Sequence, residues 1–438
     1  MQKPPARLRE VFRQLGPGMI LTGSIVGSGE LIATPTLAAT VGFAALWLIV
    51  LSCIVKVVVQ EELARHTILT GETTFQALNK IPGPRLRVSW VVWCWLLMFL
   101  GVTFQHGGIL GGIGQVFHLL FPAISVTAWV LIVAAASIAI LLRGHYRLIE
   151  AGSTFMVVSF TVITVACALL LAWTPYAIRM ENLVEGFRFH IPAGGLAVAF
   201  AVFGITGVGA TELIFYPYWC LEKGYARFVG QRDGSTAWQE RARGWIRVMQ
   251  TDTLVAMGVY TLATVAFYLL GAGILYGAQT IPKGYEMVRT LSGIYTVTLG
   301  AWAFGLFLVG AFFVLYSTVF SATASNSRVL TDFLELVRAT SMPDERTRWF
   351  WRRVMVAGLI AVQTTWYLLL GEPVQMVLIG GIAQACMLPI IAFSALYLRY
   401  KYAEPALRPS VFIDALLWVC SFLMLGFALY TLISRLYG

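Results

Sequence analysis

The chain has 438 residues, of which 58% are hydrophobic and only 12% are charged, and its mean hydropathy is +0.78. A soluble domain carries roughly 25% charged residues, so this composition excludes a soluble globular protein and predicts a helical membrane protein. The net charge of +10 gathers in loops on one side of the predicted spans, so it indicates membrane topology and no nucleic-acid partner.

Apolar runs of about 20 residues, the length of a membrane-spanning helix, follow one another along the whole chain. They are too long and too unbroken for the alternating strands of a membrane barrel. We predict eleven spans near residues 16–40, 44–64, 89–117, 124–142, 150–173, 194–221, 248–275, 295–327, 351–370, 374–398 and 411–434.

Most of the 31 Lys and Arg residues fall on one side of these spans. They lie in the N-terminal segment and in loops 65–88, 143–149, 222–247, 328–353 and 399–410. The positive-inside rule therefore places the N-terminus in the cytoplasm and the C-terminus outside, with the plasma (inner) membrane as the expected location. The longest polar connection is 222–247, and the sequence has no Walker motif, which argues against an ATP-driven pump.

One short motif occurs twice and interrupts a span each time. Residues 27–35 read GSGELIATP and residues 209–217 read GATELIFYP, so that Gly, Glu, Leu, Ile and Pro coincide. A helix break followed by a carboxylate is costly in hydrocarbon, and such a feature indicates a function. Accidental similarity of two glycine kinks is the weaker explanation, because the glutamates align as well.

The two motifs fall in spans one and six. Matching broken helices that lead two groups of five spans are typical of the LeuT-type inverted repeat. We therefore predict an all-α membrane protein with a 5+5 inverted repeat, eleven transmembrane helices, and breaks in helices 1 and 6. The first repeat is expected over 1–175 and the second over 176–400, with an additional helix over 401–438.

Each break offers ligands for a cation. A broken helix exposes carbonyls at the end of its first half and amides at the start of its second. Both glutamates begin a second half-helix, where the positive helix end favours a carboxylate. Two carboxylates facing one cavity suit a divalent cation. The candidate binding residues are Gly27, Ser28, Glu30, Gly207, Ala210, Glu212 and Leu213.

Other polar groups inside the spans are supporting candidates. Lys56 is the only lysine within a span, and the alternative is that either glutamate is its structural ion-pair partner. His106 in the third span can titrate, although an intramembrane histidine is more often hydrogen-bonded to a neighbour. Ser321 belongs to a polar stripe in the eighth span, for which cavity lining and interhelical bonding both remain open. The glycines of 107–114 predict close helix packing.

Several short runs of the sequence match one known family. They are LGPG at 15–18, GFAALW at 42–47 and GAT at 209–211, with a Leu-Pro pair at 388–389. In these runs the chain resembles the Nramp family of divalent metal transporters. The resemblance is dense over 15–78 and 205–217. It implies a LeuT-type fold, eleven or twelve spans and transport of divalent metal ions.

The resemblance also implies changes at the site. The family's first-helix signature D-P-G-N aligns with GSGE at 27–30, which puts Glu30 at a metal-ligand position. The sixth-helix signature A-x-x-M-P-H aligns with ATELIF at 210–215, so the Ala210 carbonyl persists and Leu213 replaces the methionine sulfur. The family's acidic third-helix relay corresponds to TFQHG at 103–107, which has no carboxylate. These differences make the chain similar to the branch proposed to carry magnesium without proton coupling.

We therefore predict a secondary transporter or facilitator of divalent cations of the Mg²⁺, Mn²⁺ or Ca²⁺ type, without proton coupling. The expected partners are this ion and membrane lipid, with no ATP, no nucleic acid, no cofactor and no enzymatic activity. The alternative is a transporter of a small organic solute. In one version of this alternative the solute is a cation, and the glutamates balance its charge. A receptor or an enzyme within the membrane is a weaker third alternative, because no nucleophile–base pair or metal triad is visible.

Overall fold

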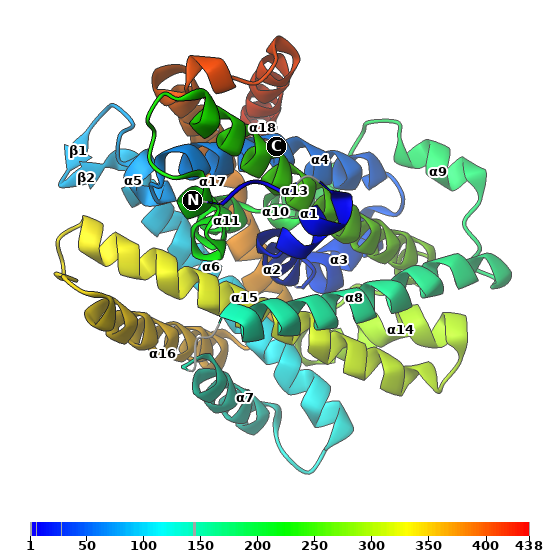
Figure 1. Cartoon of the computed structure of the whole chain (residues 1–438). Coiled ribbons are helices and arrows are strands. Elements are labelled where there is room, and N and C mark those ends of the chain that lie inside the picture. The colour runs from blue at the N-terminus through cyan, green and yellow to red at the C-terminus, as the bar shows by residue number, and fades with distance from the viewer. Residues whose placement is uncertain (1, 6, 28, 143–145, 438) are drawn as a thin grey trace.

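The computed structural model describes residues 2–5, 7–27, 29–142 and 146–437, and these residues are mainly helical (Figure 1). The α-helices are α1 (Leu8–Gln14), α2 (Pro17–Ile25), α3 (Thr34–Val41), α4 (Leu46–Thr70), α5 (Thr74–Leu78), α6 (Trp90–Leu120), α7 (Val126–Leu141), α8 (Tyr146–Leu170), α9 (Met180–Gly186), α10 (Leu196–Ile205), α11 (Ala210–Lys223), α12 (Tyr225–Val229), α13 (Thr236–Leu270), α14 (Met287–Leu299), α15 (Ala303–Leu336), α16 (Glu345–Leu370), α17 (Pro373–Tyr402) and α18 (Val411–Tyr437). The remaining elements are the π-helices η1 (Gly29–Ala33) and η4 (Gly271–Tyr276), the 3-10 helices η2 (Leu171–Trp173), η3 (Ala193–Gly195), η5 (Gly284–Glu286) and η6 (Pro405–Leu407), and the antiparallel strands β1 (Arg85–Leu86) and β2 (Val88–Ser89).

The helices follow the predicted spans, and the breaks in spans one and six are confirmed. The first break separates α2 from η1 and α3, and the second separates α10 from α11. Over the described residues, 7 helical segments are long and apolar enough to cross a membrane by themselves. The total of eleven spans stays a prediction.

Two predicted boundaries are wrong. The loop expected over 222–247 contains α12 and the first turns of α13, because Ser235 caps α13 by accepting a hydrogen bond from the Trp238 amide at 3.1 Å. The span expected over 295–327 consists of the end of α14 and most of α15. The chain turns between them at Gly300, whose φ of +90° favours glycine.

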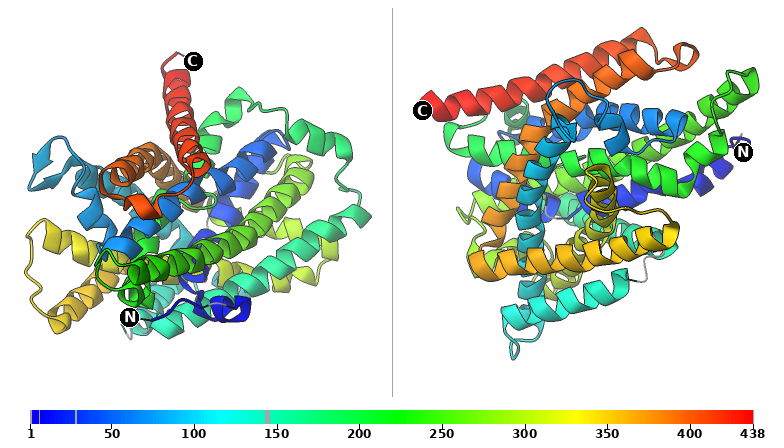
Figure 2. Two further views of the ribbon diagram at one scale, coloured as in Figure 1. Left: turned by 45° about the horizontal axis from the view of Figure 1, so that its top comes forward. Right: turned by 90° about the vertical axis from the view of Figure 1, so that its left-hand side faces the viewer.

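The broken helices lie at the centre of the bundle and the longer helices surround them (Figure 1). The half-helix α2 packs against α8, α13 and α15, whereas α10 packs against α17 and α11 packs against α4. Helix α18 packs on α17 and lies at the outer edge of the bundle (Figure 2). The packing therefore places both breaks in the interior.

The glycine-rich stretch of α6 packs closely against α16 and α17, as predicted. A Cβ atom on Gly107 would lie 2.6 Å from the Gln363 carbonyl oxygen, and one on Gly111 would lie 2.1 Å from the Tyr367 ring. Such distances are too short for any larger side chain. The stretch is therefore a helix-packing surface and no phosphate loop.

Asp252 of α13 fixes the start of α2. Its carboxylate accepts hydrogen bonds from the amides of Gly16 at 2.9 Å and Gly18 at 2.6 Å, and from the Tyr216 hydroxyl at 2.9 Å. Lys223 of α11 donates to the Leu15 carbonyl at 3.0 Å. Since the first amides of a helix have no partner within the helix, a buried carboxylate is an effective cap there.

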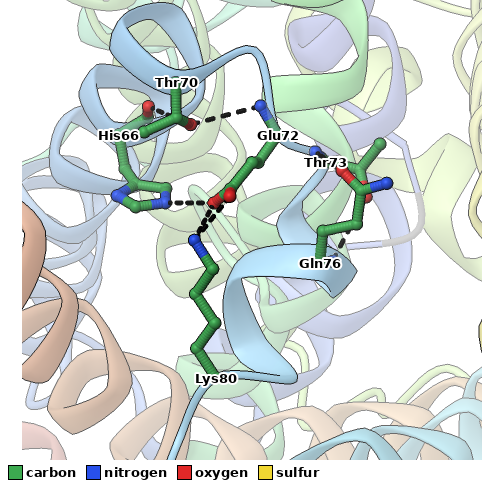
Figure 3. A network of polar contacts seen from close by, with 6 residues as sticks. All are labelled: His66, Thr70, Glu72, Thr73, Gln76 and Lys80. Carbon is green, nitrogen blue, oxygen red and sulfur yellow. Dashed lines mark hydrogen bonds and ion pairs between the residues drawn. The ribbon is translucent and has the colours of Figure 1, made fainter.

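A polar network at the end of α4 orders the following segment (Figure 3). The Glu72 carboxylate lies 3.0 Å from His66 Nε2 and accepts from Lys80 Nζ at 2.5 and 2.6 Å. Thr73 and Gln76 form a capping box at the start of α5. Burial alone would raise the pKa of Glu72, but the bonds to Lys80 and His66 outweigh it, and the pKa is lowered.

Candidate functional site

The first break is shaped by the approach of α15 to Gly27. A Cβ atom on Gly27 would lie 1.6 Å from the Thr318 hydroxyl oxygen, so only glycine fits. Thr318 in turn lies 3.2 Å from the Ser24 carbonyl oxygen, to which its hydroxyl can donate. The neighbouring helix therefore satisfies a carbonyl that the end of α2 leaves free. Ser28, the remaining predicted residue of this break, lies outside the described residues.

Glu30 is fully buried in the first turn of η1. One carboxylate oxygen accepts from the Gly27 amide at 3.3 Å, and the other accepts from the Thr264 hydroxyl of α13 at 3.0 Å. The carboxylate thus caps the break from which it projects and connects it to α13. Each carboxylate oxygen has a further lone pair with which it can bind an ion.

The second break depends on Gly207, the predicted glycine between α10 and α11. Its φ is +65°, and a Cβ atom there would lie 2.9 Å from the Cys53 Cα of α4. A side chain would therefore be strained both by conformation and by contact. Ala210 begins α11, and Leu213 is fully buried in the apolar core with its amide bonded to the Gly209 carbonyl at 3.0 Å.

Glu212 connects the two broken helices. Its carboxylate accepts from the Ser24 hydroxyl, in the last turn of α2, at 2.7 Å. The other oxygen accepts from Thr211 at 3.0 Å. The side chain is only 8% exposed. The structure therefore brings together a carboxylate of the second break and the end of the first, as the repeated motif suggested.

The sequence analysis missed two glutamines that extend this network. Gln384 of α17 accepts from the Thr211 amide at 3.1 Å and from its hydroxyl at 2.7 Å. Its own amide donates to Gln105 of α6 at 2.9 Å. Both glutamines are buried. Their position inside apolar spans was a usable signal, because a buried amide needs partners.

The partners of Lys56 are main-chain carbonyl groups and neither glutamate. Its ammonium donates to the carbonyl oxygens of Phe203 at 2.7 Å and Thr206 at 2.6 Å, at the end of α10. Among the described residues, neither Glu30 nor Glu212 lies within the 4.0 Å that defines an ion pair with Lys56. The interpretation of a glutamate as its ion-pair partner is therefore wrong, because the negative end of a half-helix takes that place.

The other supporting candidates lie on α6 and α15. His106 is buried within α6, and its Nδ1 lies 2.9 Å from the Val102 carbonyl oxygen one turn earlier. Ser321 is buried in α15, where its carbonyl accepts from the Ser325 hydroxyl at 2.6 Å. Among the residues that the structure describes, no three His, Cys, Asp or Glu side chains form a group of metal ligands. The candidate ligands at the breaks are two carboxylates, hydroxyls and carbonyls.

Comparisons with known proteins identify what the chain resembles as a whole. The profile of the natural resistance-associated macrophage protein-like (Nramp) family matches residues 18–434. An uncharacterized protein of Pasteurella multocida is 25% identical over 333 residues, which cover 74% of this chain and 71% of that protein. The divalent metal cation transporter MntH of Mycobacterium leprae is 26% identical over 331 residues, which cover 73% and 69%. A mutant of the manganese transporter of Eremococcus coleocola superposes with a TM-score of 0.67 at 15% identity, covering 100% of this chain and 98% of that one.

Proposed function

Since this chain belongs to the Nramp family, we propose that it transports a divalent cation with hard-ion character, of the Mg²⁺, Mn²⁺ or Ca²⁺ type, without proton coupling. The observation that carries the proposal is the pair of buried carboxylates at the two breaks, with Glu212 bonded across to the end of α2. Buried carboxylates are costly in a membrane interior. A divalent cation offsets that cost by neutralising two charges at once.

The ligand atoms favour hard ions. Glu30, Glu212 and Ser24 offer oxygen atoms only, and Mg²⁺ and Ca²⁺ prefer oxygen ligands. Leu213 stands where the resemblance places a methionine, so the position lacks the soft sulfur that selects softer metals. MntH of Mycobacterium leprae is described as a divalent metal cation transporter, and the protein of Eremococcus coleocola is described as a manganese transporter. Both descriptions support a metal ion as the substrate class here.

Transport by purified protein in liposomes tests this proposal. We expect uptake of Mg²⁺, Mn²⁺ or Ca²⁺ that Glu30→Gln abolishes and Glu212→Gln impairs, because each change removes a charge but keeps the shape. Glu181→Gln is the matched control, since Glu181 is exposed and lies outside both breaks. Uptake of these ions by both break variants at the wild-type rate would show that the carboxylates are structural.

The absence of proton coupling is a separate part of the proposal. Between Thr103 and Gln115 the third span has no acidic residue, and His106 is bonded within its own helix. A single histidine is a poor substitute for a carboxylate relay. A pH-sensitive dye inside the vesicles should therefore report no acidification during metal uptake. Proton entry in fixed proportion to metal entry would overturn this part.

A small organic solute, cationic in one version, remains the second candidate, because carboxylates attract an organic cation as they attract a metal ion. Glu30 and Glu212 would then serve as counter-charges. Thermal stabilisation of purified protein by amines, with none by any divalent metal, would favour this candidate.

A further inference from the structure

The position of Lys56 is unusual even for a membrane protein. The residue lies in the middle of α4 with no exposed surface, and it is among the largest fully buried side chains. Ser52 precedes it by one helical turn, so the two side chains share one face of α4. That face is directed at the end of α10, where the sixth span breaks.

Two main-chain carbonyl oxygens contact the Lys56 amino group, and the Ser52 hydroxyl bonds to the same two oxygen atoms. The Phe203 and Thr206 carbonyls lie 2.7 and 2.6 Å from Nζ. The Ser52 hydroxyl lies 3.3 and 2.9 Å from the same carbonyl oxygens. The Phe203 ring adds a cation–π contact, with Nζ 5.1 Å from its centroid. We call the Phe203 and Thr206 carbonyls, together with the Ser52 hydroxyl, the α10 cradle.

This cradle has the chemistry of a cation site. The last carbonyls of a helix have no partner within it and carry partial negative charge. In membrane transporters, the carbonyl end of a broken half-helix coordinates small cations. We infer that the α10 cradle is a monovalent-cation site that the Lys56 side chain fills, so that the second break is held without any dissolved cation.

Gln60 provides a second, independent observation. It lies one turn beyond Lys56 on the same face of α4 and is 1% exposed, yet among the residues that the structure describes neither its amide nitrogen nor its amide oxygen has a hydrogen-bond partner. Such an unsatisfied buried amide is rare. It leaves unpaired polar atoms on the face of α4 that carries Lys56.

Two substitutions separate charge from shape. Lys56→Ala leaves space for propylammonium, which matches the part of the side chain that is lost. Lys56→Met fills the same space with a neutral chain. The purified full-length protein is unfolded thermally in propylammonium, sodium, potassium or choline chloride at equal concentration, with propanol as the neutral control.

We expect both variants to melt lower than the wild type. Propylammonium should restore the Tm of Lys56→Ala saturably, while propanol and choline should not, and Lys56→Met should respond to none of them. In liposomes, metal uptake by Lys56→Ala should rise at least about tenfold with propylammonium, which corresponds to about 1.4 kcal/mol. The inference would be overturned if Lys56→Met had the Tm and the uptake of the wild type. It would also be overturned if propylammonium changed neither the Tm nor the uptake of Lys56→Ala.

The wild type gives a further test if neither variant folds. Its Tm should be the same in sodium, potassium and choline, because the cradle is already filled, and a saturable stabilisation by one alkali ion would overturn the inference. The inference rests on the proposed function only for the uptake readout. Since the melting experiments contain no divalent metal, they remain decisive even if the protein proves to carry an organic solute.

Discussion

Replacement of Asp252 should release the start of α2 from the bundle. The Asp252 carboxylate holds the amides of Gly16 and Gly18 at 2.9 and 2.6 Å, and it accepts a third bond from Tyr216. The half-helix has no other side-chain cap at its first residue. In Asp252→Ala these buried amides lose their charged acceptor, so α2 should open locally far more often than in the wild type.

The magnitude follows from the bonds that are lost. A hydrogen bond to a charged group contributes about 1.5–3 kcal/mol, and loss of an N-cap costs about 0.5–2 kcal/mol. Two amides lose their acceptor in Asp252→Ala, and water replaces part of the lost bonding. We therefore expect the free energy of opening α2 to fall by about 3 kcal/mol. A difference of this size corresponds to roughly a hundredfold in the opening equilibrium. Asp252→Asn keeps one acceptor oxygen, and we expect about half the effect.

Hydrogen–deuterium exchange measures this opening directly. Amides of residues 19–25 should exchange roughly a hundredfold faster in Asp252→Ala than in the wild type, whereas α17 should be unaffected. Tyr216→Phe is the matched control, because it removes one donor to Asp252 and leaves both amide bonds in place. Unchanged exchange of α2 in Asp252→Ala would refute the reasoning.

Three further variants have defined outcomes. Leu213→Met should raise cadmium affinity in calorimetry by supplying a soft ligand, and tight cadmium binding by the wild type would contradict the ligand argument. Gly207→Ala should lower stability by about 1–3 kcal/mol because its φ is +65°, whereas Gly258→Ala, with open space around its Cβ position, should not. Lys80 lowers the pKa of Glu72 despite burial. The contribution of Glu72 to folding stability is therefore present above the pKa that Glu72 has in the unfolded chain, and it is lost as pH falls through its pKa in the folded protein. Glu72→Gln should remove that part of the acid-induced loss of Tm, and equal pH profiles would contradict it.

The breaks could be predicted from sequence because their signal is local. Glycines followed by Glu30 or Glu212 within apolar runs are costly in hydrocarbon wherever the helices pack. The partners of these glutamates could not be predicted in the same way. Ser24 and Thr264 are ordinary hydroxyl residues in apolar spans, and only the three-dimensional packing brings them to the carboxylates.

The partner of Lys56 could not be predicted from the sequence, for a physical reason. A buried ammonium needs a partner with negative charge. Carboxylates can be recognised in a sequence, whereas the free carbonyl groups at the end of a helix cannot. The carbonyl end of α10 supplies that partner through the main chain, which any residue provides. Gln105 and Gln384 are a different case, because polar residues inside apolar runs are visible in the sequence and their burial could have been expected.

The Ser24–Glu212 bond links ion binding to helix movement in the proposed transport. It joins the last turn of α2 to the first turn of α11, and it uses a carboxylate oxygen that the proposed ion would also need. An ion that draws Glu212 away from Ser24 leaves the end of α2 held by Thr318, and its start held by Asp252. Since a conformational equilibrium shifts only through different interactions in its two states, this exchange of partners is where binding can change the position of α2. Ser24→Ala should therefore loosen the end of α2 without any ion. In metal-free protein, the amides of residues 22–26 should exchange hydrogen for deuterium faster in this variant than in the wild type, and an unchanged rate would contradict the argument.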